Sequence, residues 1–282
     1  MAQPNGPVGV CVINLKGGVG KSTIAALLAR RGFAHRGLDV LAIDLDPQAN
    51  LSQALMHDSY TDFLYQRRPS IVEVFNGYTP PTSKSSAPKA LNPSDAVETI
   101  GQYNGKSLEL IPSRFDFSDN LLGAVRPDPR TLARFLTANF QHKDLIIVDC
   151  APTESILTTA AYHATGKVLV PVKPEYFATI GFPLLQQSLS NFRNQNRAHQ
   201  ISVCGIVINN AFYHSGNDGG PEKGRAMTEI KAESNKNKWP LYNTEILHSR
   251  GFPKIMRGDN SYPGNAQYFS TFATEFFKSV GL

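Results

Sequence analysis

Residues 8–23 read VGVCVINLKGGVGKST, and this stretch decides the fold. Its first part, Val8–Asn14, is a short apolar and β-branched run, which is the pattern of a buried strand. A glycine-rich turn follows, and the apolar spacing after it predicts a helix over Lys21–Arg36 that ends at Gly37. A second buried run, Val40–Asp44, completes a right-handed βαβ unit of a parallel sheet.

The alternation of apolar runs and amphipathic stretches continues along the chain. Further strands are expected at 108–111, 145–149, 168–172 and 201–208. Helices are expected at about 128–140, 153–164, 180–193, 221–234 and 266–280. We therefore predict an α/β fold with a doubly wound, mostly parallel sheet, helices on both faces and a ligand site at the carboxyl ends of the strands.

Composition narrows the class of protein. The chain has 282 residues, of which 41% are hydrophobic and 18% charged, so it can bury a full core and is not globally disordered. Residues 1–282 are expected to form one domain with an exposed, Pro-, Ser- and Lys-rich loop at 76–94. We expect no membrane-spanning helix and no signal peptide. The three cysteines show no C-x-x-C spacing, which favours a reducing cytoplasm over a disulfide framework.

The turn between the first strand and the first helix has a phosphate-binding pattern. Its glycines allow successive backbone N–H groups to point into one concavity, and the helix N-terminus adds partial positive charge. Lys21 is expected to reach the β- and γ-phosphates, and the Ser22 hydroxyl to ligate Mg²⁺. A strict P-loop would have glycine in place of Leu15, so the loop is a variant. The expected nucleotide-binding loop residues are Gly17, Gly18, Val19, Gly20, Lys21, Ser22 and Thr23.

The run from Lys16 to Ser22 resembles the K-G-G-x-G-K-[ST] motif of the ParA/MinD family of deviant P-loop ATPases. The resemblance implies a SIMIBI-type P-loop NTPase fold, with ATP and Mg²⁺ as cofactors. In that family the first lysine of the motif reaches across a homodimer to the partner's nucleotide. Lys16 stands at that position, so we expect both Lys16 and Lys21 to act in catalysis.

Two acidic segments complete the expected site. Asp44 and Asp46 lie in a run that resembles the D-x-D-P-Q-x-N segment of ParA-type proteins. From its place at the strand end, Asp44 is expected to hold the water shell of Mg²⁺, and Asp46 to orient or deprotonate the attacking water. The resemblance implies the same hydrolytic role for Asp46, with Asp44 as its strand-end partner. Taken alone, the run also fits a turn with a helix cap. Asp149 ends the apolar run 145–149 in the Walker B form and is expected to bind Mg²⁺ through water, and the following Cys150–Thr153 resembles the family's D-C-P-P-S switch.

Resemblance elsewhere is looser. Residues 171–178 are similar to the family's P-V-x-x-E-Y-F-A segment, although Ile180 stands where many members have glutamate. Asn209 follows a predicted strand, where relatives place a polar residue against adenine, and its amide can both donate and accept. Asn210 is the competing choice for this contact.

The distribution of charge along the sequence suggests DNA as a partner. Phe182–Leu282 holds 11 Lys+Arg and 7 Asp+Glu, so this part carries +4 of the formal net charge of +5. Arg250, Lys254 and Arg257 form its densest basic stretch and are expected to contact DNA phosphates without reading sequence. The weaker candidates for such contacts are Arg193 and Arg197.

The favoured hypothesis is a ParA-type DNA-partitioning ATPase, cytoplasmic and associated with the nucleoid. Its ATP-bound homodimer would bind DNA non-specifically, and a ParB-like or other adaptor protein would stimulate slow hydrolysis and release. The alternative is a MinD-like positioning ATPase on a membrane, but the tail 268–282 has only Lys278 as a base where such a helix needs many. An iron–sulfur relative of the nitrogenase reductase type is disfavoured because Cys11 and Cys204 fall inside predicted strands.

Overall fold

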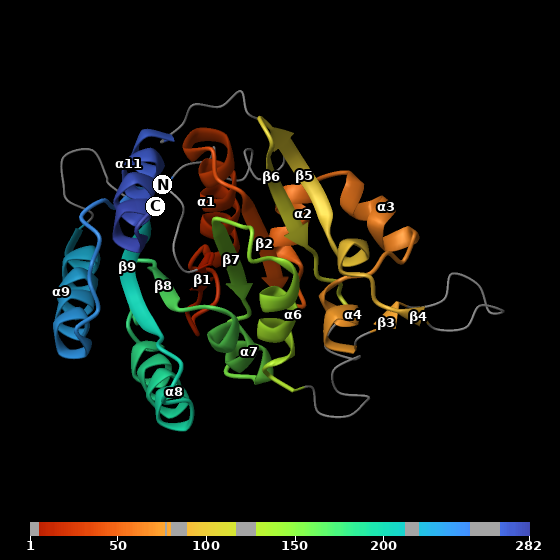
Figure 1. The fold of residues 1–282 in the computed structure, drawn as a ribbon. Helices are drawn as coiled ribbons and strands as arrows, with labels where there is room; N and C mark the ends of the chain where they lie inside the picture. The colour runs from red at the N-terminus through yellow and green to blue at the C-terminus, as the bar shows by residue number, and fades with distance from the viewer. Residues whose placement is uncertain (1–5, 77, 80–88, 117–127, 212–219, 249–265) are drawn as a thin grey trace.

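A computed structural model describes residues 6–76, 78–79, 89–116, 128–211, 220–248 and 266–282. It contains an eight-stranded sheet in the order β10-β9-β8-β1-β7-β2-β6-β5 (Figure 1). All neighbouring strands are parallel except β5 and β6, so the predicted doubly wound, mostly parallel α/β fold is confirmed. The strands are β1 (Val8–Val12), β2 (Val40–Leu45), β5 (Glu98–Tyr103), β6 (Lys106–Ile111), β7 (Leu145–Cys150), β8 (Lys167–Val172), β9 (Ser202–Ala211) and β10 (Ile246–Leu247).

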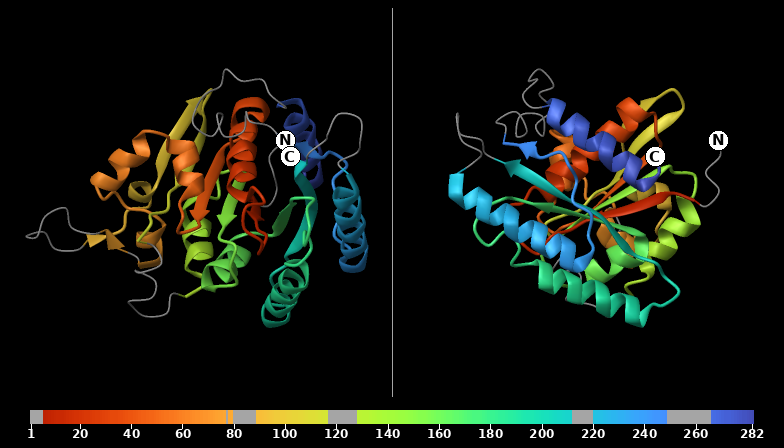
Figure 2. Two further views of the ribbon diagram at one scale, coloured as in Figure 1. Left: turned by 180° about the vertical axis from the view of Figure 1, so that it is seen from behind. Right: turned by 90° about the vertical axis from the view of Figure 1, so that its left-hand side faces the viewer.

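Helices cover both faces of the sheet, and each face has its own apolar core (Figure 2). One core includes α1 (Lys21–Arg36), α2 (Asn50–Met56), α3 (Ser59–Tyr65) and α11 (Ala266–Val280). The other includes α4 (Ile71–Asn76), α6 (Thr131–Asn139), α7 (Ile156–Ala164), α8 (Phe182–Gln195) and α9 (Gly220–Asn237). Successive residues of the buried strands face opposite cores, which is why these strands read as continuous apolar runs.

The first βαβ unit matches its prediction closely. Helix α1 begins at Lys21 and ends at Arg36, and Gly37 follows with a φ of 64°, the left-handed conformation that glycine adopts without a steric penalty. Gly32 lets α1 lie close to the sheet, because a Cβ there would be 3.3 Å from a methyl group of Val40. This close packing holds the C-terminal half of α1 against the amino ends of β2 and β7.

Several elements were not predicted. The three short helices α2, α3 and α4 occupy residues 50–76, and each is too short to show a clear helical period. Strand β5 is polar and half-exposed at the sheet edge, so it lacks the apolar run of the inner strands. Within the expected loop 76–94, β3 (Tyr78–Thr79) and β4 (Lys89–Ala90) pair in an antiparallel ladder, followed by a 3-10 turn, η1 (Pro93–Ala96), while 80–88 lie outside the described residues.

The terminal helix α11 packs on the sheet through its aromatic residues. Four phenylalanines of this helix are at most 5% exposed and belong to the core that contains α1. They are Phe269, Phe272, Phe276 and Phe277. Within the described ranges, no helix has the length and apolar character needed to cross a bilayer.

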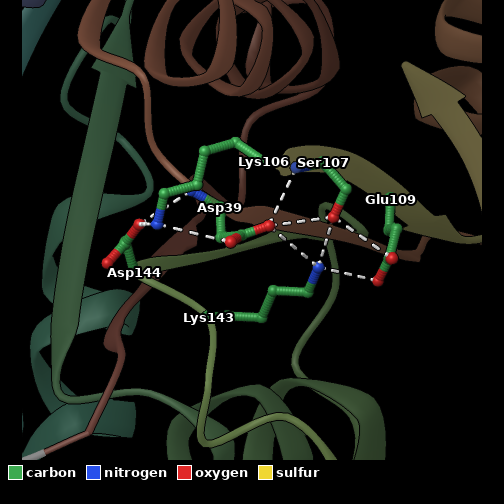
Figure 3. A network of polar contacts seen from close by, with 6 residues as sticks. All are labelled: Asp39, Lys106, Ser107, Glu109, Lys143 and Asp144. Carbon is green, nitrogen blue, oxygen red and sulfur yellow. Dashed lines mark hydrogen bonds and ion pairs between the residues drawn. The ribbon is translucent and has the colours of Figure 1, made fainter. Parts of the chain in front are cut away.

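Charged side chains join the amino ends of β2, β6 and β7 (Figure 3). The network consists of Asp39, Lys106, Ser107, Glu109, Lys143 and Asp144. The Lys143 side chain is 1% exposed, and its ammonium lies 2.8 Å from Glu109 Oε2 and donates to Ser107 Oγ at 2.7 Å. Burial alone would raise the pKa of Asp39, but hydrogen bonds from Ser107 and the charge of Lys143 outweigh it and lower that pKa. The buried charges at this end of the sheet are therefore paired.

Replacing Lys143 should test how much this network stabilises the fold. Lys143→Ala leaves Glu109 and Asp39 without their buried cation, and we expect the free energy of unfolding to fall by about 3 kcal/mol. Lys106→Ala removes a cation whose side chain is 39% exposed, and we expect a loss below about 1 kcal/mol. Urea denaturation of both variants measures the difference, and equal losses would contradict the structural role given to Lys143.

Candidate nucleotide-binding site

The loop between β1 and α1 has a backbone shape that depends on glycine. Gly18 and Gly20 have φ values of 73° and 89°, in the left-handed region. A Cβ on Gly20 would lie 2.2 Å from the Asn209 amide nitrogen, so no other residue fits there without displacement. Gly17 and Gly18 are exposed, and open space surrounds the positions where their Cβ atoms would stand. The loop therefore presents backbone without side chains, which suits close approach of phosphate.

Two buried asparagines hold this loop in place. Asn14 accepts a hydrogen bond from the Lys16 N–H at 2.9 Å and donates to the Pro171 carbonyl at 2.8 Å. The Asn209 amide donates to the Val19 carbonyl at 2.8 Å. Asn209 thus supports the phosphate loop from β9, while its expected contact with adenine stays a prediction and the side chain of Asn210 lies outside the described residues. The role of Asn14 in holding the loop was not predicted from the sequence. The signal that could have revealed this role is a polar residue at the end of an otherwise apolar run.

The register of β2 against β7 brings the two predicted strand-end carboxylates together. Asp44 and Asp149 are direct partners in this parallel ladder, and both are fully buried. Lys21, 7% exposed, lies close enough to Asp149 and Asp46 for their charges to act on it. Burial lowers the pKa of Lys21, and these carboxylates oppose that shift. The structure therefore gathers Lys21, Asp44, Asp46 and Asp149 into one buried charged cluster beneath the loop.

Asp149 is the least satisfied member of this cluster. Both of its carboxylate oxygens are buried, and neither forms a hydrogen bond of acceptable geometry with a described residue. Burial, followed by the charge of Asp44, raises the pKa of Asp149 well above its ordinary value. The Ser22 hydroxyl and Lys21 oppose this rise. A buried carboxylate whose oxygens accept no well-formed hydrogen bond, beside a hydroxyl, is a donor set that fits Mg²⁺ and its bound waters.

Asp44, by contrast, already has several donors. Its carboxylate accepts the Asp46 N–H at 3.1 Å, the Ser52 N–H at 2.8 Å and the Ser52 hydroxyl at 2.7 Å. Burial still raises the pKa of Asp44 to about 7. Asp46, 6% exposed, accepts the Gln48 N–H at 2.9 Å. Asp44 thus shapes the turn that carries Asp46, and the catalytic and metal roles expected of the two residues stay predictions.

Lys16 is held by its own subunit. Its ammonium lies 2.9 Å from Glu175 Oε1 and donates to the Tyr176 carbonyl at 3.2 Å. Lys173 lies 2.6 Å from the other oxygen of Glu175, and the two lysines lower the pKa of Glu175 although burial would raise it. A Cβ on Gly181 would be 3.2 Å from Asn14 Oδ1, so this segment packs directly on the loop.

Beside Lys16 lies an exposed apolar surface, which we call the 176–184 surface. It consists of Tyr176, Phe177, Ile180 and Leu184, whose exposed fractions run from 56% to 68%. Phe177 has a φ of 59°, a conformation that costs free energy for a bulky residue. Large exposed apolar groups gathered in this way mark an interaction site more often than a solvated surface.

Arg250, Lys254 and Arg257 lie outside the described residues. The three cysteines are buried and free, and no group of three or more metal-binding His, Cys, Asp or Glu side chains occurs in the described part of the chain. Ser22 and Thr23 begin α1 beside Lys21, where the predicted motif places them.

A glycine loop on a βαβ unit, a lysine in the first helical turn and facing carboxylates on two neighbouring strands define a P-loop nucleotide-binding protein. Comparison with known protein families leads to the same class of protein. The family model described as AAA domain matches residues 9–202. The chain belongs to this family, that of the ParA/MinD-type P-loop ATPases.

Individual relatives are consistent with this assignment. The chromosome partitioning protein ParA of Myxococcus xanthus is 30% identical over 201 residues, 71% of this chain and 63% of that protein. Matches to uncharacterized proteins of Methanocaldococcus jannaschii and Mycobacterium tuberculosis span 57% to 72% of their lengths.

Solved structures show the same fold. An ATP complex of a variant of Cyanothece McdA has a TM-score of 0.78 at 18% identity, and the match covers 99% of this chain and 98% of that one. Cobyrinic acid a,c-diamide synthase of Mycobacterium smegmatis, bound to an ATP analog and magnesium, has a TM-score of 0.69 at 22% identity, covering 95% and 93%. Structural neighbours of this chain thus bind ATP or an analog, and one of them also binds magnesium.

Asp149→Asn should separate stability from ligand binding. Because burial raises the pKa of Asp149 in the folded state, its stability contribution is complete below the unfolded pKa of about 4 and is lost as pH rises towards the folded value. We therefore expect Asp149→Asn to stabilise the ligand-free protein by about 1 kcal/mol at pH 8, and less at pH 5. Urea denaturation in EDTA measures this gain.

The same variant should lose Mg²⁺-dependent affinity for a fluorescent ATP analog. Asp44→Asn is the matched control. The Asp44 carboxylate accepts three hydrogen bonds, and an amide accepts them less strongly, so this variant should be less stable. An Asp149→Asn protein that unfolds at lower urea and keeps Mg²⁺-dependent binding would contradict the assignment.

Proposed function

We propose that this protein is an ATPase of the ParA type that partitions or positions a cargo on DNA. The observation that carries the proposal is the site itself: two lysines, Lys16 and Lys21, flank the glycine loop above the buried carboxylates of Asp44, Asp46 and Asp149. The family and the names of its relatives support the same class. The reaction is hydrolysis of ATP to ADP and phosphate.

Each residue has a role that follows from its position. The loop N–H groups and Lys21 bind the phosphates and stabilise negative charge on the transferred phosphoryl group. Ser22 and Asp149 would hold Mg²⁺ with Asp44 behind them, and bound Mg²⁺ supplies neutralisation of phosphate charge. Asp46, at the turn that Asp44 shapes, orients the attacking water or accepts its proton.

Lys16 couples hydrolysis to dimerisation. To reach a partner's nucleotide it must leave Glu175 and the Tyr176 carbonyl, which hold it in its own subunit. The 176–184 surface adjoins Lys16, and a second copy of the chain would bury it. Because the site is complete only in the dimer, we expect slow turnover by the isolated protein and faster turnover when an adaptor protein favours the dimer.

The DNA-binding step distinguishes this proposal from a MinD-like membrane ATPase. Arg250, Lys254 and Arg257 remain the sequence-based candidates for DNA contacts. The phenylalanines of α11 pack into the core and are therefore not available to insert into a membrane. This packing favours DNA binding over membrane binding.

Co-sedimentation with DNA and with anionic liposomes, each with ADP and with ATP, tests the proposal directly. We expect ATP-dependent sedimentation with DNA alone. Lys21→Ala should abolish it because the phosphates lose their main cation, while Asp46→Ala should bind nucleotide, stop hydrolysis and stay on DNA. ATP-dependent sedimentation with liposomes only would favour the MinD-like alternative. Normal ATP hydrolysis by the Asp46→Ala variant would contradict the catalytic role proposed for Asp46.

The 176–184 surface gives a second test. Ile180→Ser with Leu184→Ser replaces two exposed apolar side chains, so we expect at least tenfold weaker ATP-dependent dimerisation and unchanged nucleotide affinity of the monomer. Tyr65→Ser is the control, because Tyr65 is 83% exposed on α3. Analytical ultracentrifugation measures both. Dimerisation that is equally strong in all three proteins would assign this surface to a different partner.

A further inference from the structure

The end of the sheet opposite the phosphate loop has a basic hollow of about 590 Å³. Helix α8 runs from Gly181, beside the loop, to Gln195 at this opposite end. The hollow lies where α8 ends and where β8 and β9 begin. Its lining residues are Gly166, Lys167, Arg193, Arg197, His199, Gln200, Ile201 and Ser202.

Charge in this hollow has one sign. None of the eight described residues that line it is acidic, whereas Lys167, Arg193 and Arg197 are cations. Arg193 is half-buried and its Nε donates to the Ile201 carbonyl at 3.0 Å, which fixes the guanidinium at the rim. Arg197 is exposed and forms no ion pair or hydrogen bond with a described residue. The cations here are therefore available to an external anion.

Behind the hollow lies a histidine whose pKa responds to nearby positive charge. His163 lies behind His199, with ring centroids 6.1 Å apart. Burial first, and then the charges of Arg130 and His199, lower the pKa of His163, while Asp128 opposes them. Asp128 is itself paired with Arg134 at 2.8 Å, so part of its charge is neutralised.

Helix α8 lacks acidic residues altogether. No aspartate or glutamate occurs between Tyr176 and Asn217, a stretch that contains the whole helix. The exposed positions in its last turns carry amides instead, at Asn191, Asn194 and Gln195. Amide side chains and arginines together are the donors that proteins use on the phosphates of duplex DNA, whereas ordinary solvated helices mix both charge signs.

We propose that the basic hollow formed by Lys167, Arg193 and Arg197, with the amides of α8, binds the phosphate backbone of double-stranded DNA. This inference rests on the proposed function, since it names a surface through which that DNA is held. The surface is separate from the stretch Arg250–Arg257 in sequence and lies away from the nucleotide. DNA can therefore contact it without covering the site of hydrolysis.

Fluorescence anisotropy with a duplex of random sequence, in ATP and over a series of salt concentrations, tests the inference. Arg193→Gln with Arg197→Gln should weaken binding roughly tenfold near physiological salt and reduce the slope of log affinity against log salt by about two. Arg197→Gln alone, which breaks no contact within the described protein, should lower the slope by about one. ATP-dependent dimerisation should be unchanged in both variants.

The control pair is Arg67→Gln with Lys278→Gln, which removes the same charge from exposed positions on other elements. Affinity and slope equal to those of this control would overturn the inference and leave the proposed function intact. Absence of DNA binding by the unaltered protein would instead overturn the proposed function. Arginine-dependent binding to anionic vesicles with no binding to DNA would overturn both assignments in favour of a lipid surface.

Discussion

The structure depends on how the chain places charge at the buried carboxyl ends of β2 and β7. Their parallel register sets Asp44 opposite Asp149 with no exposure of either residue, and Lys21 lies among these carboxylates from the start of α1. Burial first, and then the charge of Asp44, raises the pKa of Asp149, because the interior screens charge poorly. The fold tolerates this arrangement because strands on both sides and two apolar cores hold the register in place.

Buried charges are compensated differently at the two ends of the sheet. At the amino end, Lys143 contacts Glu109, Ser107 and Asp39, so its charge is compensated within the protein (Figure 3). At the carboxyl end, the oxygens of Asp149 have no hydrogen-bond partner among the described residues. Breaking a compensated buried pair is costly, whereas carboxylate oxygens that accept no hydrogen bond are available to a ligand. The contrast supports the carboxyl end as the candidate binding site.

Lys16 ties the candidate nucleotide site to a neighbouring segment of the chain. Its ion pair with Glu175 joins the phosphate loop to the segment that presents the 176–184 surface. Displacement of Lys16 would therefore break a contact with the segment that carries that surface. Helix α8 continues from the same segment to the basic hollow at the far end of the sheet. One short segment and one helix thus connect the candidate nucleotide site, the 176–184 surface and the proposed DNA surface.

Local sequence determined the parallel α/β class, the bounds of α1 and the loop motif, because a buried strand, a glycine turn and an amphipathic helix each leave a short-range pattern. It did not reveal α2, α3 and α4, whose length hides any period, or the edge strand β5, which is polar. Only the tertiary structure showed that Asn14 and Asn209 hold the loop, that Glu175 holds Lys16, and that Arg193 and Lys167 share a hollow. These contacts join residues distant in the chain, and strand register and helix packing, which decide them, are properties of the whole fold.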